Sequence, residues 1–306
     1  MTDRSSPGSG GVAAPAPGRR GAARARPRRF APAEPAEHVY PEHLRDSLDS
    51  LPASPGVYVF HGEPGDLPLY IGKSVNLRSR VLSHLRNPEE ARMLRQARSI
   101  SHQRTAGEIG ALLLEARMIK EQHPLFNQRL RRNRQLCSIR LDGDVPEIVH
   151  SKDIDFATES GLHGLFGSRH AAIEALRDIA REHRLCHGAL GLERLAKGRP
   201  CFRAMLGQCA GACRGDETAQ AHAERLRAAL AAIAVACWPW PGSVGLVERD
   251  GDFVQIHGVR NWCYLGSAPT IEAAAGFDRV APGFDADGYR ILCGPVLRGE
   301  VEIVKL

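Results

Sequence analysis

Three basic side chains and one carboxylate in the first half of the chain have spacings suited to cleavage of a phosphate ester. Lys73 directly follows Gly72, and Arg80 and His84 are four residues apart, so on a helix these two lie along one edge. Glu115 falls beside the apolar stripe of another expected helix, where a partly desolvated carboxylate could hold a hard cation such as Mg²⁺. A basic helix edge or a border glutamate alone is usually only solvated surface, so only their combination indicates phosphate chemistry.

Four cysteines in the second half of the chain lie close enough in sequence for their thiolates to form one metal site. They are Cys186, Cys201, Cys209 and Cys213, with 14, 7 and 3 residues between them. Four thiolates can hold a zinc ion or an iron–sulfur cluster. The spacing is not the paired CxxC pattern of zinc fingers, and buried or free thiols are the alternative.

The segments that carry these residues alternate between strand and helix patterns. We predict strands over 56–60, 69–71 and 99–104, and helices over 41–51, 74–86, 88–98 and 105–122. The first two strands should form a hairpin, and Thr105 with Glu108 has the capping-box spacing that starts a helix. Further along, we predict short strands over 137–168, helices over 170–184 and 217–235, and strands around a turn at 250–252, near 289–293 and near 301–304.

The positive charge of the chain is concentrated in two places. Residues 1–36 hold seven Arg against two acidic residues, and residues 69–140 hold fifteen Lys and Arg against five Asp and Glu, a net charge of +10. Such a local excess is typical of proteins that bind a phosphate backbone, and an incidental surface bias is the alternative. No stretch approaches the ~20 apolar residues of a membrane span, and no secretory signal is evident, so we expect a cytoplasmic protein.

Together these motifs resemble the GIY-YIG nuclease family. Gly-Val-Tyr at 56–58 and Tyr-Ile-Gly-Lys at 70–73 are followed in order by Arg80, Glu115 and Asn127. The runs that resemble the N-terminal nuclease of UvrC in particular are 72–81, 111–116 and 124–127. The resemblance implies an α/β (α+β) fold: a small central antiparallel sheet flanked by helices, then a cysteine-rich helical segment and a small mixed region at the C-terminus.

The resemblance also implies one-metal hydrolysis of a DNA phosphodiester. By that likeness Glu115 binds Mg²⁺ or Mn²⁺, and Tyr70 orients or activates the attacking water, whose pKa Lys73 lowers.

The remaining site residues would surround the phosphate. Tyr58 is implied to hydrogen-bond near it, Arg80 to stabilise charge on the phosphoryl oxygens, and Asn127 to hold the site together. His84 stands where UvrC nucleases commonly have a tyrosine, and a histidine can hydrogen-bond a phosphate or shuttle a proton.

The likeness to UvrC covers roughly residues 41–215. It implies a [4Fe-4S] cluster at Cys186, Cys201, Cys209 and Cys213, with Zn²⁺ as the alternative. Only about ninety residues remain after it, too few for the UvrB-binding hairpin and second nuclease of UvrC. The chain therefore resembles the Cho branch of UvrC homologues, which implies incision on the 3′ side of a lesion, in damaged double-stranded DNA already bound by UvrB.

We expect four segments along the chain. They are a disordered basic arm (1–36), a GIY-YIG nuclease domain (37–136), a UvrC-like linker with the cysteine-rich segment (137–215), and an acidic, Trp-containing C-terminal segment (216–306) hypothesised to dock on UvrB. One alternative is a stand-alone restriction or homing endonuclease, although no helix-turn-helix or zinc-finger spacing is evident. Another is a non-catalytic DNA-binding scaffold, against which the intact site residues argue.

Overall fold

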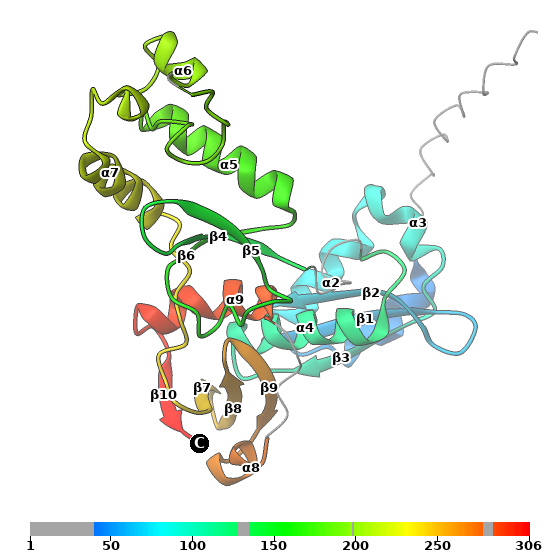
Figure 1. The fold of residues 1–306 in the computed structure, drawn as a ribbon. Coiled ribbons are helices and arrows are strands. Elements are labelled where there is room, and N and C mark those ends of the chain that lie inside the picture. Colours follow the sequence, from blue (N-terminus) through cyan, green and yellow to red (C-terminus); the bar gives the residue numbers. More distant parts are fainter. Residues whose placement is uncertain (1–39, 128–134, 198, 278–283) are drawn as a thin grey trace, which may run out of the picture. The chain divides into compact units, whose positions relative to one another are not determined.

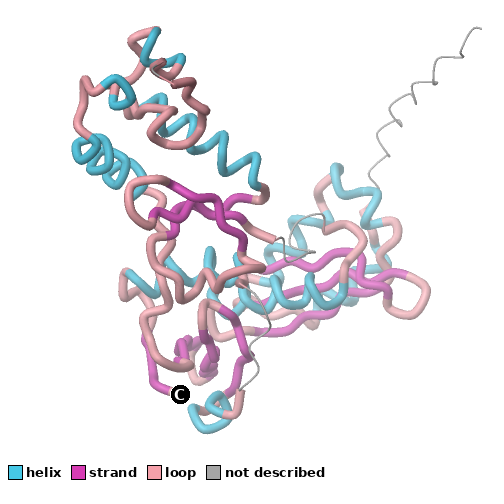
Figure 2. Tube along the Cα trace, in the orientation of Figure 1, coloured by secondary structure: helices cyan, strands magenta, loops and turns pink. Residues whose placement is uncertain are grey.

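The computed structural model describes residues 40–127, 135–197, 199–277 and 284–306. Within these ranges the chain forms three small antiparallel sheets with helices beside them, which confirms the expected mixed α/β fold (Figure 1, Figure 2). The predicted disordered arm, residues 1–36, lies outside the described residues. None of the described helices is long and apolar enough to cross a membrane.

The first sheet is the centre of the nuclease unit and has the strand order β2-β1-β3. Its strands are β1 (Gly56–Gly62), β2 (Leu67–Ser74) and β3 (Ser99–Arg104). β1 and β2 pair as the predicted hairpin, with Tyr58 opposite Gly72. Side chains alternate between the faces of a strand, so Tyr58 and Phe60 join the buried cluster on one face. Val57 and Val59 join the cluster on the other face.

Helices pack on both faces of this sheet. They are η1 (Glu42–Leu44), α1 (Arg45–Asp49), α2 (Leu77–Leu85), η2 (Pro88–Glu90), α3 (Ala91–Leu94) and α4 (Glu108–Gln122). α2 packs through Val81 and Leu85 in the cluster that contains Tyr58. α4 packs through Leu114 and Ile119 in the cluster on the opposite face. The sheet thus lies between the two helices that carry the expected site residues.

The second sheet, in the order β5-β4-β6, belongs to the middle of the chain. Its strands are β4 (Cys137–Leu141), β5 (Pro146–His150) and β6 (Leu162–Phe166), and the helices that follow are α5 (Arg169–Glu182), α6 (Phe202–Met205), η3 (Ala212–Arg214) and α7 (Ala219–Ala231). Ile139 of β4 shares a buried cluster with Leu176 of α5 and Leu226 of α7. The predicted helices near 170–184 and 217–235 therefore pack on this sheet through their apolar stripes.

The C-terminal sheet has the order β10-β7-β8-β9. Its elements are β7 (Val244–Asp250), β8 (Phe253–Arg260), β9 (Cys263–Ala268), α8 (Ile271–Ala275), α9 (Ala286–Leu297) and β10 (Glu302–Lys305). The turn predicted at 250–252 joins β7 to β8, where Asp250 pairs with Phe253. The last predicted strand, near 301–304, corresponds to β10.

The strand predicted near 289–293 is wrong, because these residues lie inside α9. The side chain of Asp285 accepts a hydrogen bond from the backbone amide of Asp287 (3.1 Å) and so caps the helix. Leu292 and Val296, four residues apart, form its buried stripe. A short apolar run fits a strand or a buried helix equally well by periodicity, which is why the sequence pattern misled.

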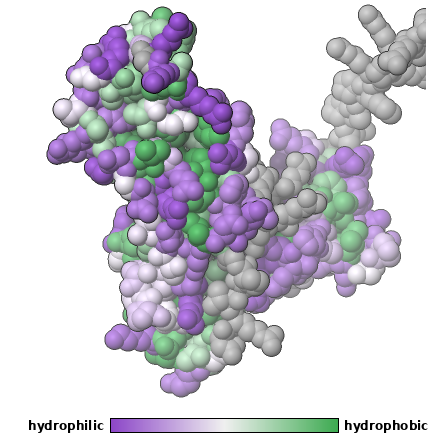
Figure 3. All heavy atoms as spheres, in the orientation of Figure 1, coloured by the Kyte–Doolittle hydropathy of each residue, from purple (hydrophilic) through white to green (hydrophobic). Residues whose placement is uncertain are grey.

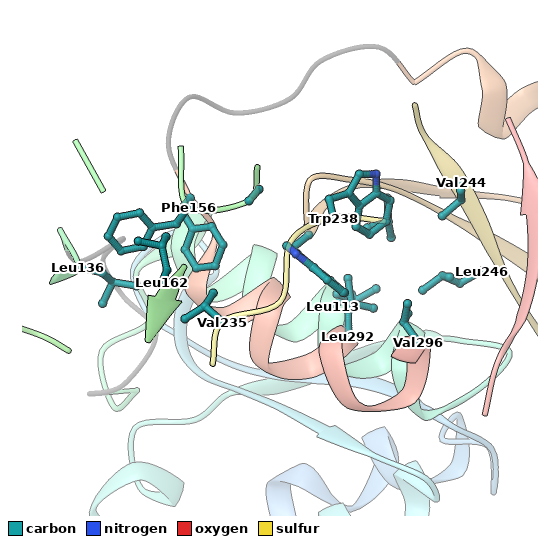
Figure 4. Close-up of a cluster of buried hydrophobic side chains, with 14 of the residues drawn as sticks. Leu113, Leu136, Phe156, Leu162, Val235, Trp238, Val244, Leu246, Leu292 and Val296 are labelled. Carbon is teal, nitrogen blue, oxygen red and sulfur yellow. The ribbon is translucent and has the colours of Figure 1, made fainter. Parts of the chain in front are cut away.

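One large buried cluster joins the nuclease helix α4 to the C-terminal sheet. Leu113 of α4 lies in this cluster with Trp238, Leu246, Leu292 and Val296 (Figure 4). The face of the molecule in Figure 3 is mostly hydrophilic, with hydrophobic residues gathered in scattered patches. α4 is therefore a shared element, packed on the nuclease sheet along one side and on the C-terminal sheet along another.

Candidate active site and cysteine cluster

Tyr58 and His84 meet on the sheet face that α2 covers. The phenol oxygen of Tyr58 lies 2.5 Å from Nε2 of His84, and both side chains are buried. The ring of Tyr70 lies beside both, with centroid distances of 6.2 Å to Tyr58 and 5.5 Å to His84. A Cβ at Gly72 would stand 2.3 Å from the hydroxyl oxygen of Tyr58. The motif needs glycine there because the Tyr58 hydroxyl approaches the backbone of β2.

Glu90 completes a chain of hydrogen bonds that the sequence did not predict. Its Oε2 contacts Nδ1 of His84. A carboxylate only accepts hydrogen bonds, so Nδ1 donates and Nε2 is left to accept the Tyr58 hydroxyl proton. Burial raises the pKa of Glu90, but hydrogen bonds from His84 and Asn87 and the charge of Arg80 lower it, so the pKa lies below its usual range. The segment predicted as one helix over 88–98 is instead divided into η2 and α3, and Glu90 lies at their junction.

Arg80 reaches the same cluster from an exposed position on α2. The interaction of its guanidinium with the nearby Tyr58 hydroxyl raises the pKa of Arg80. Burial, with a smaller contribution from Tyr70, raises the pKa of Tyr58 far above its usual range. At neutral pH the phenol therefore stays protonated while the guanidinium stays charged.

Glu115 approaches β2 from α4, on the other side of the sheet. Its Oε1 accepts a hydrogen bond from the backbone amide of Lys73 (3.1 Å). The ammonium of Lys73 points elsewhere and forms an ion pair with Glu108 (Nζ–Oε1 2.5 Å), a partner that the sequence did not predict. Burial raises the pKa of Glu115, although the amide and the charges of Lys73 and Arg80 lower it. Tyr70 lies within electrostatic range, since burial and then the charge of Glu115 raise its pKa.

Asn127 is joined to the strand that carries the Tyr-Ile-Gly-Lys motif. Its Oδ1 accepts a hydrogen bond from the backbone amide of Ile71 (2.9 Å), and its Nδ2 donates one to the carbonyl of Ile71 (2.8 Å). The side chain thus pairs with β2 as a neighbouring strand would. Ile71 lies between Tyr70 and Gly72, so Asn127 braces the backbone of the site.

The residues around Glu115 fit a divalent cation. No ion pair joins Glu115 to another residue in the part of the chain that the structure describes. A partly buried carboxylate is destabilised by desolvation, and a bound cation relieves this. One carboxylate is also a common protein ligand set for Mg²⁺, which keeps several water ligands.

Three of the four cysteines are brought within reach of one metal centre. The Sγ atoms of Cys186, Cys201 and Cys213 all lie within 4.8 Å of one another. Cys209 is buried in the same cluster but does not belong to that group of three. None of the four forms a disulfide. A compact, buried set of thiols fits a metal ion or a cluster, because soft thiolate ligands bind zinc and iron–sulfur centres.

A buried histidine that the sequence did not predict supports this cluster. Nε2 of His222, on α7, accepts a hydrogen bond from the backbone amide of Cys186 (3.0 Å). The backbone amide of Cys201 in turn donates to Sγ of Cys213 (3.3 Å). These two contacts hold the backbone of Cys186 and the thiol of Cys213 in place.

Models of protein families match three successive regions of the chain. They are the UvrC-like GIY-YIG domain at 54–128, the UvrC/Cho excinuclease middle domain at 136–232 and the excinuclease Cho C-terminal domain at 243–306. Excinuclease Cho of Escherichia coli (strain K12) is 56% identical over 271 residues, which cover 89% of this chain and 92% of that protein. The chain belongs to the Cho excinucleases. It is thus a metal-dependent excision nuclease of the GIY-YIG type, and the restriction-enzyme and scaffold alternatives no longer apply.

More distant relatives of this Cho excinuclease match a smaller part of it. The UvrABC system protein C of Caldicellulosiruptor saccharolyticus is 32% identical over 180 residues, which cover 56% of this chain and 30% of that protein. The GIY-YIG endonuclease domain of UvrC from Thermotoga maritima, solved with magnesium as its catalytic cation, is 32% identical. That match covers 27% of this chain and 93% of the domain, with a TM-score of 0.25.

Proposed function

We propose that this enzyme makes the 3′ incision of nucleotide excision repair, cutting damaged double-stranded DNA to which UvrB is bound, by one-metal hydrolysis. The observation that carries the one-metal chemistry is Glu115. It is a single, partly buried carboxylate of α4 that accepts a hydrogen bond from the motif strand β2 and forms no ion pair with another described residue. A Mg²⁺ or Mn²⁺ ion bound there would stabilise charge on the leaving oxygen.

The side chains around Tyr58 would manage the phosphate and its protons. The exposed guanidinium of Arg80, next to the Tyr58 hydroxyl, can contact phosphoryl oxygens. Tyr58 is protonated at neutral pH and donates a hydrogen bond to His84. During the reaction, His84, with Glu90 behind it, would accept that proton as a general base. The ring of Tyr70 lies beside Tyr58, and Tyr70 is close enough to Glu115 for the charge of that carboxylate to raise its pKa. This position is suited to orienting water. Lys73, whose ammonium is paired with Glu108, would lower the pKa of the attacking water.

We propose that Cys186, Cys201, Cys209 and Cys213 hold a [4Fe-4S] cluster, with Zn²⁺ as the alternative. The close approach of three thiols and the burial of the fourth support a metal centre of one of these kinds. Protein purified without oxygen should be brown with iron bound, or colourless with zinc. Well-folded protein that contains neither metal would contradict the proposal.

Recognition of the lesion requires a partner. The nuclease unit is basic, and contacts to phosphate carry no information on sequence or damage. We propose that UvrB supplies this information and that the C-terminal segment docks on it. Trp238 and Trp262 are buried in the core, so they cannot form the docking surface, whereas Ile271 and Leu297 are 42% and 53% exposed.

The decisive test is incision of one damaged duplex, labelled separately at each strand end, with and without UvrB and with Mg²⁺ or EDTA. We expect one UvrB-dependent, metal-dependent nick on the 3′ side of the lesion. Ile271→Asp and Leu297→Asp should lose UvrB-dependent incision and keep weak, UvrB-independent nicking in Mn²⁺. Equal incision without UvrB, or a 5′ nick, would refute the proposal.

A further inference from the structure

Helix α4, which carries Glu115, begins without a cap of its own. Its N-cap residue is Gly107, which has no side chain to accept a hydrogen bond. Thr105, which the sequence suggested as the capping residue, instead donates from Oγ1 to the carbonyl of Gly107 (2.9 Å). The amides of the first helical turn have no acceptor within the helix, so they need one from elsewhere.

The acceptor comes from Glu248 on β7, 138 and 139 residues away along the chain. Oε1 of Glu248 accepts the amide of Ile109 (2.9 Å), and Oε2 accepts the amide of Gly110 (2.7 Å). These are the second and third positions of the helix, whose amides an N-cap side chain would normally take. A negative charge at a helix N-terminus also interacts favourably with the helix dipole.

Glu248 is itself held in place by a chain of polar groups in the C-terminal sheet. Nε2 of His257 donates to Oε2 of Glu248 (2.9 Å), and Nδ1 of His257 lies 2.7 Å from Oγ of Ser267. That hydroxyl also bonds the hydroxyl of Tyr264 (2.6 Å). His257 is fully buried, so neither it nor the carboxylate it holds can turn freely toward solvent.

Two glycines at the start of α4 leave room for this contact. A Cβ at Gly107 would stand 2.2 Å from Oε1 of Glu248, and a Cβ at Gly110 would stand 2.5 Å from Cε1 of His257. The backbone of Gly107 is extended (φ −173°), a conformation that any residue adopts. Gly107 is therefore required by the neighbouring carboxylate and not by its own backbone.

Further contacts with the C-terminal part of the chain hold α4 near its start, in its middle and near its end. Near its start, Oε1 of Gln255 accepts the amide of Ala106 (2.9 Å). Near its end, Nζ of Lys120 pairs with Asp285 (2.7 Å) and Asp287 (3.1 Å). Between them, Leu113 enters the shared core shown in Figure 4. Glu115, two residues on, projects instead to the amide of Lys73.

We propose that Glu248 is a positioning residue of the nuclease: it caps α4 across the interface with the C-terminal sheet and so fixes where Glu115 lies. The C-terminal sheet is then a structural part of the active site and not only a docking module. The catalytic consequence, though not the cap itself, rests on the proposed role of Glu115 as the metal ligand.

The test is a double-mutant rescue in the full-length chain. Glu248→Ala should speed hydrogen exchange of the Ile109 and Gly110 amides roughly five- to tenfold, the loss expected for a removed cap. It should also raise the Mn²⁺ concentration needed for half-maximal nicking. Adding Gly107→Ser to Glu248→Ala should reverse both effects, because serine reaches the same amides once the carboxylate is gone. Gly107→Ser alone should be harmful, since it meets Glu248.

Glu302→Ala is the matched control, because it removes an exposed carboxylate of the same sheet whose partner is Arg249. It should change neither readout. If Glu248→Ala folds poorly, Glu248→Gln, which keeps one accepting oxygen, should give an intermediate exchange rate. Unchanged exchange in Glu248→Ala, or no rescue by Gly107→Ser, would overturn the cap. Faster exchange with an unchanged Mn²⁺ requirement would overturn the positioning role. The exchange readout needs neither metal nor activity, so it stands even if Glu115 proves not to bind metal.

Discussion

The Nε2 atom of His84 lies 2.5 Å from the phenol oxygen of Tyr58, so residues from α2 and β1 share one buried hydrogen bond. The resemblance to UvrC nucleases implied that a tyrosine is common at the position of His84. A phenol has one polar atom, its hydroxyl oxygen, whereas an imidazole has two ring nitrogens, and here the second nitrogen, Nδ1, contacts Glu90. A proton taken from Tyr58 can therefore be stabilised by a carboxylate behind the ring.

Removal of the Glu115 carboxylate should abolish cutting and leave DNA affinity near normal. The carboxylate contributes to transition-state stabilisation through the metal and makes few ground-state contacts with DNA. The measurement is nicking of a labelled duplex alongside a binding titration. Glu121→Ala is the control, since Glu121 lies on the same helix and forms an ion pair with Arg117 across one turn. Normal nicking by Glu115→Ala would show that the metal is held elsewhere.

Loss of His84 as a proton acceptor should lower turnover on the order of 10²-fold, the lower end for general acid–base catalysis. Glu90→Ala should lower it less, because the ring remains but is no longer oriented. Glu90→Gln can still accept from Nδ1 and should keep more activity than Glu90→Ala. Single-turnover rates of His84→Phe and the Glu90 variants are compared with Glu89→Ala, which changes the exposed neighbouring carboxylate. Equal rates for Glu90→Ala and Glu89→Ala would exclude this role.

Arg80→Ala should also lower turnover on the order of 10²-fold, the usual loss for a preorganised donor to developing charge. The matched control is Arg78→Ala, which changes an exposed arginine of the same helix whose ion-pair partner is Asp49. Both variants are assayed for rate and for the salt dependence of binding. A change confined to salt-dependent affinity would identify Arg80 as a residue that only positions the backbone.

The capping carboxylate predicts a pH dependence of stability. Burial raises the pKa of Glu248, but hydrogen bonds from His257, Gly110 and Ile109 outweigh burial, so the pKa is lowered in the folded protein. A carboxyl group whose pKa is lower in the folded than in the unfolded protein stabilises the fold at pH values above its unfolded pKa of about 4.3. This stabilisation is lost as the pH falls through the folded pKa.

Denaturant midpoints of wild type and Glu248→Gln should therefore differ most at neutral pH and converge below about pH 4. Glu302→Gln serves as the control, since Glu302 lies at the surface of the same sheet. A difference that stays constant from pH 7 to pH 3 would mean that the ionised carboxylate does not stabilise the fold.

The sequence alone determined the elements whose signals are local. Strand alternation at 56–60 and helical periodicity after Thr105 arise from neighbouring residues, so β1 and α4 could be predicted. The order of the tyrosine, lysine, arginine and glutamate motifs likewise indicated the nuclease family and its site residues. Glu90 lies only six residues after His84. The pair of acidic residues that follows Asn87-Pro88 was therefore a signal in the sequence that a carboxylate could lie near this histidine.

The tertiary structure decided the contacts between residues far apart in the chain. No local pattern connects Glu248 with Gly107 or His222 with Cys186, because each pair meets only after whole elements have packed. The same holds for α9, whose short apolar run is helical because its stripe packs on α4 and on the C-terminal sheet. Backbone amides and apolar side chains take their partners from whichever elements the fold brings near. For the helix that carries Glu115, these partners come from the C-terminal part of the chain.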